Sequence, residues 1–390
     1  MKENLKILFI PRWYPNRVNP MSGIFIKRHA LAVALKHKVA VLFVNADPCM
    51  KDKIYDSEFS NEDGILSVRV YYNNSIPAIP FISRAIKFYR YFKSCKKGIG
   101  IMEKEFGTPD ISHIHVLART FFIAYFYQYF HKVPFVVSEQ WSGYLPEDGL
   151  YKGFFKKMLT QIAIRKASAV TTVSESLKNA MRNHGLENNY SIIPNVADVN
   201  LFSPVQYKKP HTKIQLLTVA VMDNRAKNIS GVINVMKKLR EIRTDFEYHI
   251  IGGGEDRLML EKLASENNLL NSFVFFDGSK IPEEVAGAMR EVDLFILFSN
   301  YDNMPCVMVE SFASGIPVIG SDIHGMKEHI KEGRGIVVPP GNEEALLNAI
   351  LSAIEKLNSF DKNLIRKYAE DNFSYQAVVD KFDLVYQKVI

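Results

Sequence analysis

Residues 302–319 read Asp-Asn-Met-Pro-Cys-Val-Met-Val-Glu-Ser-Phe-Ala-Ser-Gly-Ile-Pro-Val-Ile. An apolar segment, residues 294–298, precedes this stretch, and a second, residues 317–320, ends it. The pattern predicts a buried strand, a loop, a helix and another buried strand. Pro305 suits the first turn of the helix, and Gly315 suits its end. Helices that alternate with buried strands are typical of parallel α/β sheets.

This loop and helix predict a seat for a phosphate group. The backbone N–H groups at the start of a helix are free and lie at its positive end. The residues placed there are Asn303, Met304, Pro305, Cys306 and Val307. Asp302 lies in the loop, and Glu310 lies more than one turn into the helix, where its carboxylate can accept hydrogen bonds from ribose hydroxyls. The plain structural alternative makes Asp302 a helix cap and Glu310 a surface residue.

The same alternation of strands and helices fills both halves of the chain. Strands are expected over residues 6–11, 38–45, 66–72, 111–116, 135–139 and 169–173, and then over 214–222, 248–251, 273–276, 294–298 and 317–320. The sequence thus predicts an α/β fold with two Rossmann-like, doubly wound domains that face each other across a cleft.

The expected domain boundaries follow from composition. Residues 1–200 form the N-terminal domain, and residues 201–213, with two prolines among polar side chains, form a linker. Residues 214–372 form the C-terminal domain, and residues 373–390 form a helix that we expect to pack back on the N-terminal domain. A chain of 390 residues is long enough for two such cores.

Composition excludes several classes of protein. With 47% hydrophobic and 23% charged residues, the chain is typical of a soluble globular protein. No segment has the pattern of a signal peptide or a membrane span. Cys49, Cys95 and Cys306 are too far apart in the sequence to suggest a disulfide framework or a zinc site. We therefore expect a cytoplasmic protein.

Positive charge is concentrated in the first half. Residues 1–200 carry 27 Lys and Arg against 16 Asp and Glu, and the rest of the chain carries 22 against 26. One basic cluster lies in a predicted amphipathic helix over residues 81–106 and another follows it: Arg84, Lys87, Arg90, Lys93, Lys96 and Lys97, then Lys152, Lys156, Lys157, Arg165 and Lys166. An anionic membrane surface or an anionic acceptor fits this charge, and an ordinary solvated face is the alternative. No nucleic-acid recognition motif is present.

The pattern from Asp302 to Glu310, two acidic residues separated by seven others, resembles the donor-site signature of the family 4 retaining glycosyltransferases, which have the GT-B fold. The resemblance covers nearly the whole chain. Further motifs similar to those of this family follow in its order at residues 13–15, 20–23, 110–115, 193–198, 227–228, 251–255, 274–278, 324–328 and 335–340.

The resemblance implies a retaining transfer of a sugar from a nucleotide-diphosphate sugar to an acceptor hydroxyl, in bacterial polysaccharide, lipopolysaccharide or glycolipid synthesis. The donor, linked to UDP or GDP, would bind the C-terminal domain. The acceptor, a glycan or a lipid-linked molecule, would bind the N-terminal domain. Such an enzyme would be cytoplasmic or peripheral on the inner face of the membrane.

The same resemblance implies roles for individual residues. Lys227 would hold the diphosphate, Asp302 the hydroxyls of the transferred sugar, and Glu310 the ribose. Lys227 also follows the first strand of the second domain, which places it at the cleft. The remaining donor-side candidates are Gly23, Arg225, Gly253 and Asp277, and the acceptor-side candidates are His115, Glu139 and Gln140. Gly23 would let backbone approach the donor closely, although a turn glycine explains it equally.

Four positions depart from the family pattern. Asp302 stands where the family has Glu, Val221 where an Arg is usual, Gln140 where many relatives have His, and Val196 where Gly is common. Arg225, in the same loop as Val221, is a candidate to replace the absent arginine. These departures keep two alternatives open, a non-catalytic GT-B binding subunit and a sugar-nucleotide epimerase of the same fold.

The sequence predicts neither a metal nor a cofactor. It has no Asp-x-Asp pair and no cluster of residues with the spacing of metal ligands. Residues 252–254 are three consecutive glycines, but they lack the Gly-x-Gly-x-x-Gly spacing of a dinucleotide site. We therefore expect protein donors and helix dipoles to stabilise the diphosphate in place of a divalent cation.

Overall fold

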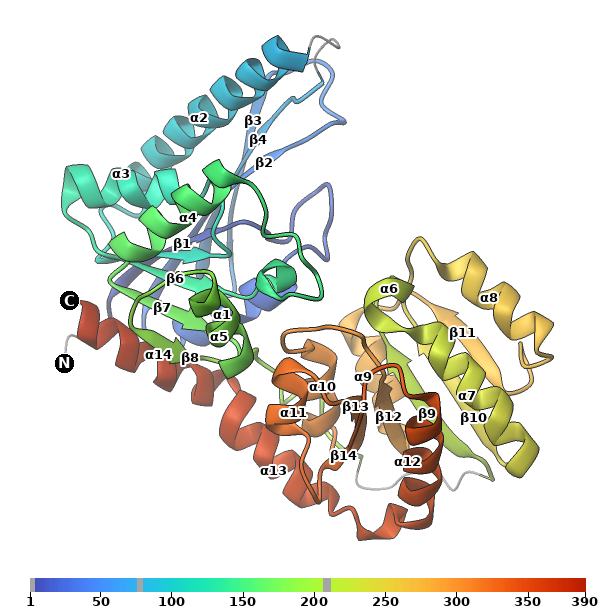
Figure 1. Ribbon diagram of the computed structural model, residues 1–390. Coiled ribbons are helices and arrows are strands. Elements are labelled where there is room, and N and C mark those ends of the chain that lie inside the picture. The colour runs from blue at the N-terminus through green and yellow to red at the C-terminus, as the bar shows by residue number, and fades with distance from the viewer. Residues whose placement is uncertain (1–3, 76–79, 206–211) are drawn as a thin grey trace.

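The computed structural model describes residues 4–75, 80–205 and 212–390. The chain forms two domains, each built on its own sheet (Figure 1), which confirms the predicted pair of Rossmann-like units. Residues 206–211, which belong to the predicted linker over 201–213, lie outside the described residues, as do residues 1–3 and 76–79.

The first domain contains an eight-stranded sheet in the order β3-β4-β2-β1-β5-β6-β7-β8. All neighbouring strands are parallel except β3 and β4, which pair antiparallel. The strands are β1 (Lys6–Pro11), β2 (Lys38–Ala46), β3 (Tyr55–Glu62), β4 (Ile65–Tyr72), β5 (Ile111–His115), β6 (Phe135–Glu139), β7 (Ala169–Thr172) and β8 (Tyr190–Ile192). The strand order reverses between β1 and β5, so this is the point where ligands of such sheets bind.

The second domain contains a six-stranded sheet, all parallel, in the order β11-β10-β9-β12-β13-β14. Its strands are β9 (Ile214–Val219), β10 (Phe246–Ile251), β11 (Val274–Gly278), β12 (Leu294–Leu297), β13 (Val318–Ser321) and β14 (Gly335–Val338). Here the order reverses between β9 and β12, next to the stretch over residues 302–319.

Three strands were not predicted, and all three lie at sheet edges. β3, β8 and β14 each pair on one side only. Most of their side chains are half-buried or exposed, and β3 carries Asp56, Glu58 and Glu62. An edge strand needs less apolar surface than a central one, so its apolar pattern is weak.

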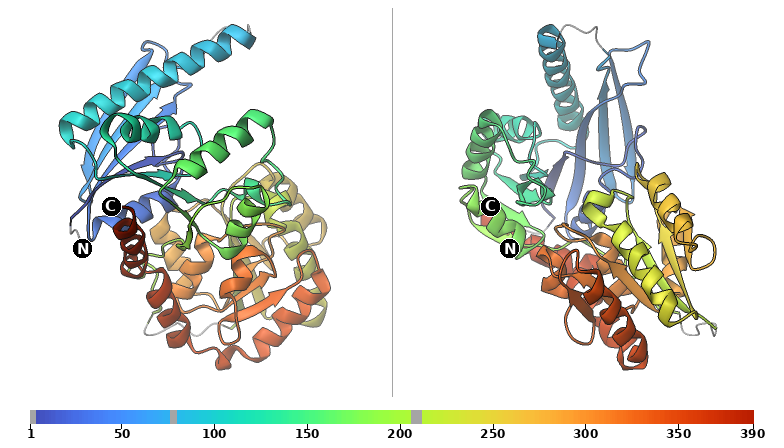
Figure 2. Two further views of the ribbon diagram at one scale, coloured as in Figure 1. Left: turned by 60° about the vertical axis from the view of Figure 1, so that its left-hand side comes forward. Right: turned by 45° about the vertical axis from the view of Figure 1, so that its right-hand side comes forward.

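Helices cover both faces of each sheet, as Figure 2 shows in two further views. In the first domain they are α1 (Ile24–Ala34), α2 (Pro80–Glu105), α3 (Phe121–His131), η1 (Ser142–Tyr144), α4 (Phe154–Lys166) and α5 (Glu175–Asn183). In the second they are α6 (Asn224–Lys227), α7 (Ile229–Ile242), α8 (Arg257–Glu266), α9 (Pro282–Arg290), α10 (Cys306–Ala313), α11 (His324–His329), α12 (Glu343–Glu355), η2 (Leu357–Ser359) and α13 (Lys362–Phe373). α14 (Tyr375–Val389) follows α13.

The last two helices connect the domains. α13 packs on α10, whereas α14 packs on α1 in the first domain. Ser374 separates them, because its extended backbone ends α13 and its hydroxyl accepts a hydrogen bond from the N–H of Ala377 in α14. The Tyr386 hydroxyl lies 2.7 Å from Nδ1 of the buried His113, so α14 is fixed to the core of the first sheet.

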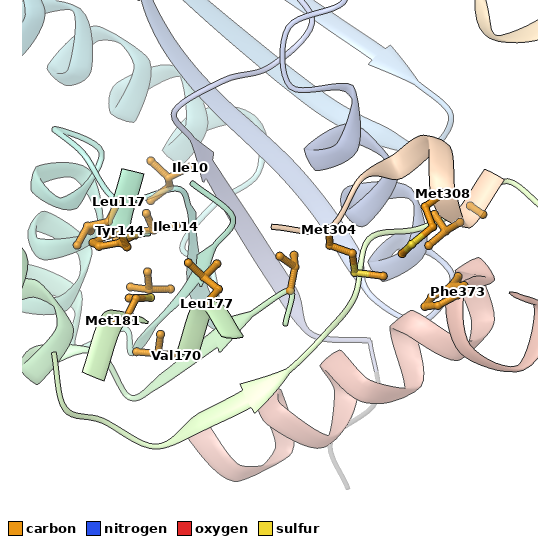
Figure 3. Close-up of a cluster of buried hydrophobic side chains, with 14 of the residues drawn as sticks. Ile10, Ile114, Leu117, Tyr144, Val170, Leu177, Met181, Met304, Met308 and Phe373 are labelled. Atoms are coloured by element: carbon orange, nitrogen blue, oxygen red, sulfur yellow. The ribbon is translucent and has the colours of Figure 1, made fainter. Parts of the chain in front are cut away.

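One cluster of buried apolar side chains extends across both domains. Figure 3 shows Ile10, Ile114 and Leu177 of the first domain in this cluster, and Met304 and Met308 of the second. Because side chains from both domains exclude water together, the apolar contact favours a fixed arrangement of the two sheets. Among the helices of the described residues, none is long and apolar enough to cross a bilayer.

Helix α10 begins one residue later than predicted. Pro305 is its N-cap, with extended backbone, rather than its first helical residue. Gly315 adopts φ +73° just beyond the end of the helix, and a side chain there would lie 2.9 Å from the carbonyl oxygen of Lys362. Glycine is therefore required by both backbone conformation and space at this helix end.

Candidate functional site

A cavity of about 700 Å³ lies in the cleft and is lined from both domains. The first domain contributes Trp13, Gln140 and Trp141 among others, at or just beyond the ends of β1 and β6. The second domain contributes the loops that follow β9 and β12. The predicted residues that line this cavity are Lys227, Asp302, Asn303, Met304, Pro305, Cys306, Val307, Arg225 and Gln140.

Lys227 and Asp302 form an ion pair on the wall of this cavity. The Lys227 ammonium contacts the Asp302 carboxylate, and both side chains keep about a fifth of their surface exposed. Helix α6 positions the lysine, since the Asp223 carboxylate caps the N–H of Ala226 and so fixes this short turn. A cation and a carboxylate therefore stand together at the surface of the cavity.

The N-terminus of α10 opens into the same cavity. Pro305 and the first two helical residues, Cys306 and Val307, line the cavity, and no side chain of the described residues caps this helix end. Free N–H groups at a helix start attract anions. Burial raises the pKa of the Cys306 thiol to about 12, so the thiol stays protonated at neutral pH.

Contacts from the first domain hold the loop before α10. The Asn303 side-chain amide donates to the carbonyl oxygen of Gln140 at 2.8 Å, and the Asn195 amide donates to the carbonyl oxygen of Met304 at 2.8 Å. Arg225 donates across the cleft to the carbonyl oxygen of Asp148 at 3.3 Å. The geometry of the loop thus depends on the position of the other domain.

Val221 and Arg225 both reach the cavity. Val221, which stands at the position of the absent arginine, lines the cavity and is 67% exposed. Arg225 lines it as well, and its guanidinium lies 5.8 Å from the centre of the Tyr301 ring. The loop after β9 therefore still brings a guanidinium to the cleft, although from a different position.

Glu310 is buried and has a partner that the sequence did not indicate. Its carboxylate Oε1 lies 2.5 Å from Nη1 of Arg28, in α1 of the other domain. Burial disfavours the charge of Arg28, but the Glu310 carboxylate outweighs it and holds the Arg28 pKa above its ordinary value. Glu310 is 5% exposed and does not line the cleft cavity, so it is not the surface residue of the plain alternative.

Three predicted donor-side residues lie outside the lining of the cavity. Gly23 is the N-cap of α1 with φ +64°, and a side chain there would lie 2.3 Å from the carbonyl oxygen of Trp13. That close contact explains this glycine without a ligand. Gly253 lies in the loop after β10, and Asp277 contacts His249 at 2.9 Å on the surface.

The acceptor-side candidates separate in the structure. Gln140 lines the cleft, and its amide lies 3.0 Å from Nδ1 of His29. His115 is fully buried among the rings of Phe9, His29 and His113, and burial holds its pKa well below the ordinary value. The prediction that His115 faces the cleft is therefore not supported by its position.

Glu139 is also fully buried, just behind the cleft. Its Oε1 accepts hydrogen bonds from the N–H of Leu117 at 2.8 Å and from the hydroxyl of Tyr144 at 3.1 Å. Figure 3 shows Leu117 and Tyr144 close together. Burial raises the pKa of Glu139 to about 7. Among the residues that the structure describes, no group of three or more His, Cys, Asp or Glu could hold a metal ion.

Two family models match the chain. One, described as glycosyl transferases group 1, matches residues 199–370, and the other, described as glycosyltransferase family 4, matches residues 30–201. Between them they cover residues 30–370, which include most of both domains.

Curated relatives match over part of their length. The MMP alpha-(1->4)-mannosyltransferase of Mycolicibacterium hassiacum is 24% identical over 60% of this chain and 57% of that protein. The amylovoran biosynthesis glycosyltransferase AmsK of Erwinia amylovora is 28% identical over 36% of each. The chain thus spans about half the length of the first curated relatives it matches.

Solved structures share the fold at low identity. Sucrose-phosphate synthase from Thermosynechococcus elongatus aligns with a TM-score of 0.77 at 18% identity, over 98% of this chain and 99% of that one. HepE from Anabaena, solved in complex with UDP and glucose, aligns with a TM-score of 0.74 at 15% identity, over 98% and 100%.

We expect the stability of the protein to depend on the titration of Glu139. In the unfolded chain this carboxyl ionises near pH 4.5, and in the folded protein near 7, so the folded state binds the extra proton between these values. The free energy of unfolding of wild type therefore falls as the pH rises from 4.5 to above 7, by about 3 kcal/mol in total. Glu139→Gln keeps an acceptor oxygen but cannot ionise. The free energy of unfolding of Glu139→Gln, measured relative to that of wild type, should therefore rise by about 3 kcal/mol between pH 4.5 and 7.5.

Urea unfolding followed by tryptophan fluorescence measures this difference, since both tryptophans lie in the first domain. Glu62→Gln, an exposed position of the same domain, controls for replacing a carboxylate by an amide. If the difference between Glu139→Gln and wild type is the same at both pH values, the buried carboxyl does not titrate as described.

We expect Arg28 and Glu310 to depend on each other for stability. Arg28→Met leaves a buried carboxylate unpaired and should cost about 3–5 kcal/mol. Glu310→Gln should also be costly, whereas sequence alone predicts that a change at Glu310 leaves the fold intact. The double variant should cost clearly less than the sum of the two single variants, which thermal unfolding can measure. Additive costs would contradict the pairing.

Proposed function

The chain belongs to the family 4, group 1 glycosyltransferases, and on this basis we propose that it transfers a sugar from a nucleotide-diphosphate sugar to an acceptor hydroxyl with retention of configuration. The donor is linked to UDP or GDP, and the acceptor is a glycan or lipid-linked molecule of bacterial polysaccharide, lipopolysaccharide or glycolipid synthesis. The observation that carries the proposal is the Lys227–Asp302 pair beside the open N-terminus of α10.

In the proposed reaction the acceptor oxygen forms a bond to the anomeric carbon while the bond from that carbon to the diphosphate breaks. The electron pair leaves with the nucleoside diphosphate, whose departing oxygen takes up the proton of the acceptor hydroxyl. Negative charge therefore grows on the diphosphate. Lys227, Arg225 and the N–H groups at the start of α10 line the same cavity and are suited to stabilise this charge.

The proposal assigns Asp302 to the hydroxyls of the transferred sugar. Its carboxylate is only partly exposed and is held by Lys227, so its orientation is fixed before a ligand binds. Glu310 is proposed to act on the ribose through the loop and helix that it anchors, since its own carboxylate contacts Arg28. HepE, which was solved in complex with UDP and glucose, has the same fold and is consistent with this donor class.

We also propose that no divalent metal takes part. Lys227, Arg225 and the N-terminus of α10 supply positive charge and N–H donors at one wall of the cavity, the position at which a metal would otherwise stabilise the diphosphate.

Calorimetry with UDP, GDP, ADP and CMP in excess EDTA tests the donor proposal. We expect UDP or GDP to bind without metal. Lys227→Gln should weaken binding by about 1.5–3 kcal/mol, because a charge-assisted hydrogen bond is lost. Lys262→Gln, an exposed lysine of the same domain outside the cavity, is the matched control.

Complete loss of nucleotide binding in EDTA would overturn the metal-free proposal. Wild-type affinity in Lys227→Gln would overturn the role of that lysine. Nucleotide binding without any release of sugar from UDP- or GDP-sugars, in the presence or absence of acceptors, would favour a binding subunit over an enzyme.

Peripheral binding to an anionic membrane through α2 is a further part of the proposal. One side of α2 packs Tyr91, Cys95 and Met102 into the core, as the alternative of a buried apolar face requires. Its first half, however, exposes Phe88 and Tyr89, at 48% and 62%, beside the basic residues. Basic residues next to exposed aromatic rings are typical of helices that rest at a membrane surface.

Co-sedimentation with vesicles of phosphatidylglycerol and phosphatidylcholine tests this binding. Each Lys near an anionic surface contributes about 1 kcal/mol, and salt screens the attraction beyond about 8 Å. The triple variant Lys87→Glu, Lys93→Glu and Lys97→Glu should therefore lose co-sedimentation, and 0.5 M salt should have the same effect on wild type.

The matched control carries the same three charge reversals on the second domain, at the exposed Lys262, Lys331 and Lys356. It should still co-sediment with the vesicles. If the α2 variant co-sediments with the vesicles as well as the control does, the exposed side of α2 is an ordinary solvated face.

A further inference from the structure

A second cavity, of about 630 Å³, lies entirely in the first domain. It opens beyond the carboxyl ends of β1 and β5, between which the strand order of the first sheet reverses. Arg12 follows β1, and residues 117–120 follow β5. In open parallel sheets this position is the favoured place for a ligand.

Three cationic side chains line this cavity, namely Arg12, Arg119 and Lys156. Within the described part of the chain, none of them lies within salt-bridge distance of a carboxylate. Arg12 lies 4.7 Å from the ring of Trp13. Lys156 lies 3.9 Å from the ring of Trp141 and donates to the carbonyl oxygen of Leu150 at 3.3 Å. Two carboxyl groups attract these cations from beyond salt-bridge distance: Glu139 attracts Arg12 and Lys156, and Asp148 attracts Lys156. Burial raises the pKa of Glu139 to about 7, so three cations around one cavity still create a potential that attracts an anion.

The rest of the cavity is apolar and continues onto the surface of α4. Tyr72, Tyr91 and Phe121 form part of its wall. Leu159 of α4 lines the cavity and is nevertheless 43% exposed, so it connects the cavity to the outer face of that helix. The exposed apolar side chains of this face are Phe154 at 76%, Phe155 at 74%, Met158 at 38% and Ile162 at 39%.

The two tryptophans of the cleft cavity contact cations of the second cavity. Trp13 and Trp141 line the cleft cavity. Arg12, which lines the second cavity, lies within 5.4 Å of both rings. A ligand held at Arg12 is thus separated from the cleft by little more than an indole ring.

We propose that the second cavity binds the acceptor, an amphiphile whose anionic headgroup contacts Arg12, Arg119 and Lys156 and whose apolar chain lies over the outer face of α4. The inference rests on the proposed transferase function, because it places an acceptor hydroxyl beside the cleft. Cations with no salt-bridge partner among the described residues suit an anionic headgroup, and the exposed apolar side chains of α4 suit the apolar chain of the ligand. A small soluble sugar would use neither feature.

Tryptophan fluorescence measures this binding, because the chain has only two tryptophans and both contact Arg12, which lines the cavity. Octyl phosphate, titrated below its critical micelle concentration, should change the fluorescence in a saturable manner. Arg119→Gln and Lys156→Gln should each raise the Kd about tenfold or more. Arg165→Gln, at the exposed end of α4 and outside the cavity, removes the same charge and should leave the Kd unchanged.

Two further ligands and one variant distinguish the contribution of the anionic headgroup to binding from that of the apolar chain of the ligand. Octyl glucoside lacks the charge, and inorganic phosphate lacks the chain, so both should bind much more weakly than octyl phosphate. If either binds as tightly, the proposal is overturned. Lengthening hexyl to octyl phosphate should lower the Kd by up to roughly fourfold per methylene group. Leu159→Ser should reduce this decrease in Kd. If the decrease is the same as in wild type, the apolar chain of the ligand does not lie over α4.

Nucleotide calorimetry on the same proteins separates this inference from the donor proposal. Arg119→Gln should keep the nucleotide affinity of wild type, since Arg119 does not line the cleft cavity. If wild type binds nucleotide but shows no saturable response to octyl phosphate, the anionic acceptor is wrong and the donor site stands. If wild type binds octyl phosphate but no nucleotide, the donor proposal fails.

Discussion

The parallel pairing of the strands is the constraint on which both cavities depend. In a parallel sheet all carboxyl ends meet at one edge, and the loops that leave this edge diverge where the strand order reverses. β1 and β5 diverge in the first sheet, and β9 and β12 in the second. Arg12 and residues 117–120 follow the first pair, while Lys227 and Asp302 follow the second. In each sheet, parts of the chain that are distant in sequence thus reach one cavity through the strand order.

Contacts between the domains make the geometry of the donor side a property of the whole molecule. The loop before α10 is held by Asn195 and by the carbonyl oxygen of Gln140, and α10 itself is held by Arg28. The Arg28–Glu310 pair is almost fully buried, so separating the domains must either leave both charges unpaired or admit water to them. Intermediate separations gain neither the pairing nor full hydration, which favours discrete arrangements of the domains over a gradual opening.

Local sequence was sufficient for much of the fold. The central strands were predicted because they are buried on both faces and read as continuous apolar runs. β3, β8 and β14 were missed because edge strands bury less surface. Pro305 and Gly315 placed the ends of α10 to within a residue, since each has a backbone preference that few other residues share.

The site was only partly predictable for a physical reason. Lys227 and Asp302 could be assigned to one cleft because they follow neighbouring strands of one sheet. Arg28 gave no such signal, because its partner Glu310 is 282 residues away and belongs to the other domain. His115 was an acceptor-side candidate through the family resemblance, but its ring lies among three other aromatic rings in the core. A sequence motif does not show how deeply a strand residue is covered by the rest of the fold.

The two cavities also differ in how their cations are held. Lys227 is paired with a carboxylate, so a ligand at that position must compete with a counter-charge that is already present. Arg12 and Lys156 are held by indole rings, which attract a cation through their quadrupole but carry no net charge. Glu139 attracts both cations without contacting them, and burial raises the pKa of this carboxyl to about 7. An acceptor anion therefore meets less opposing charge at these cations than a ligand meets at Lys227, whereas the donor site responds most to the added charge that develops on the leaving diphosphate.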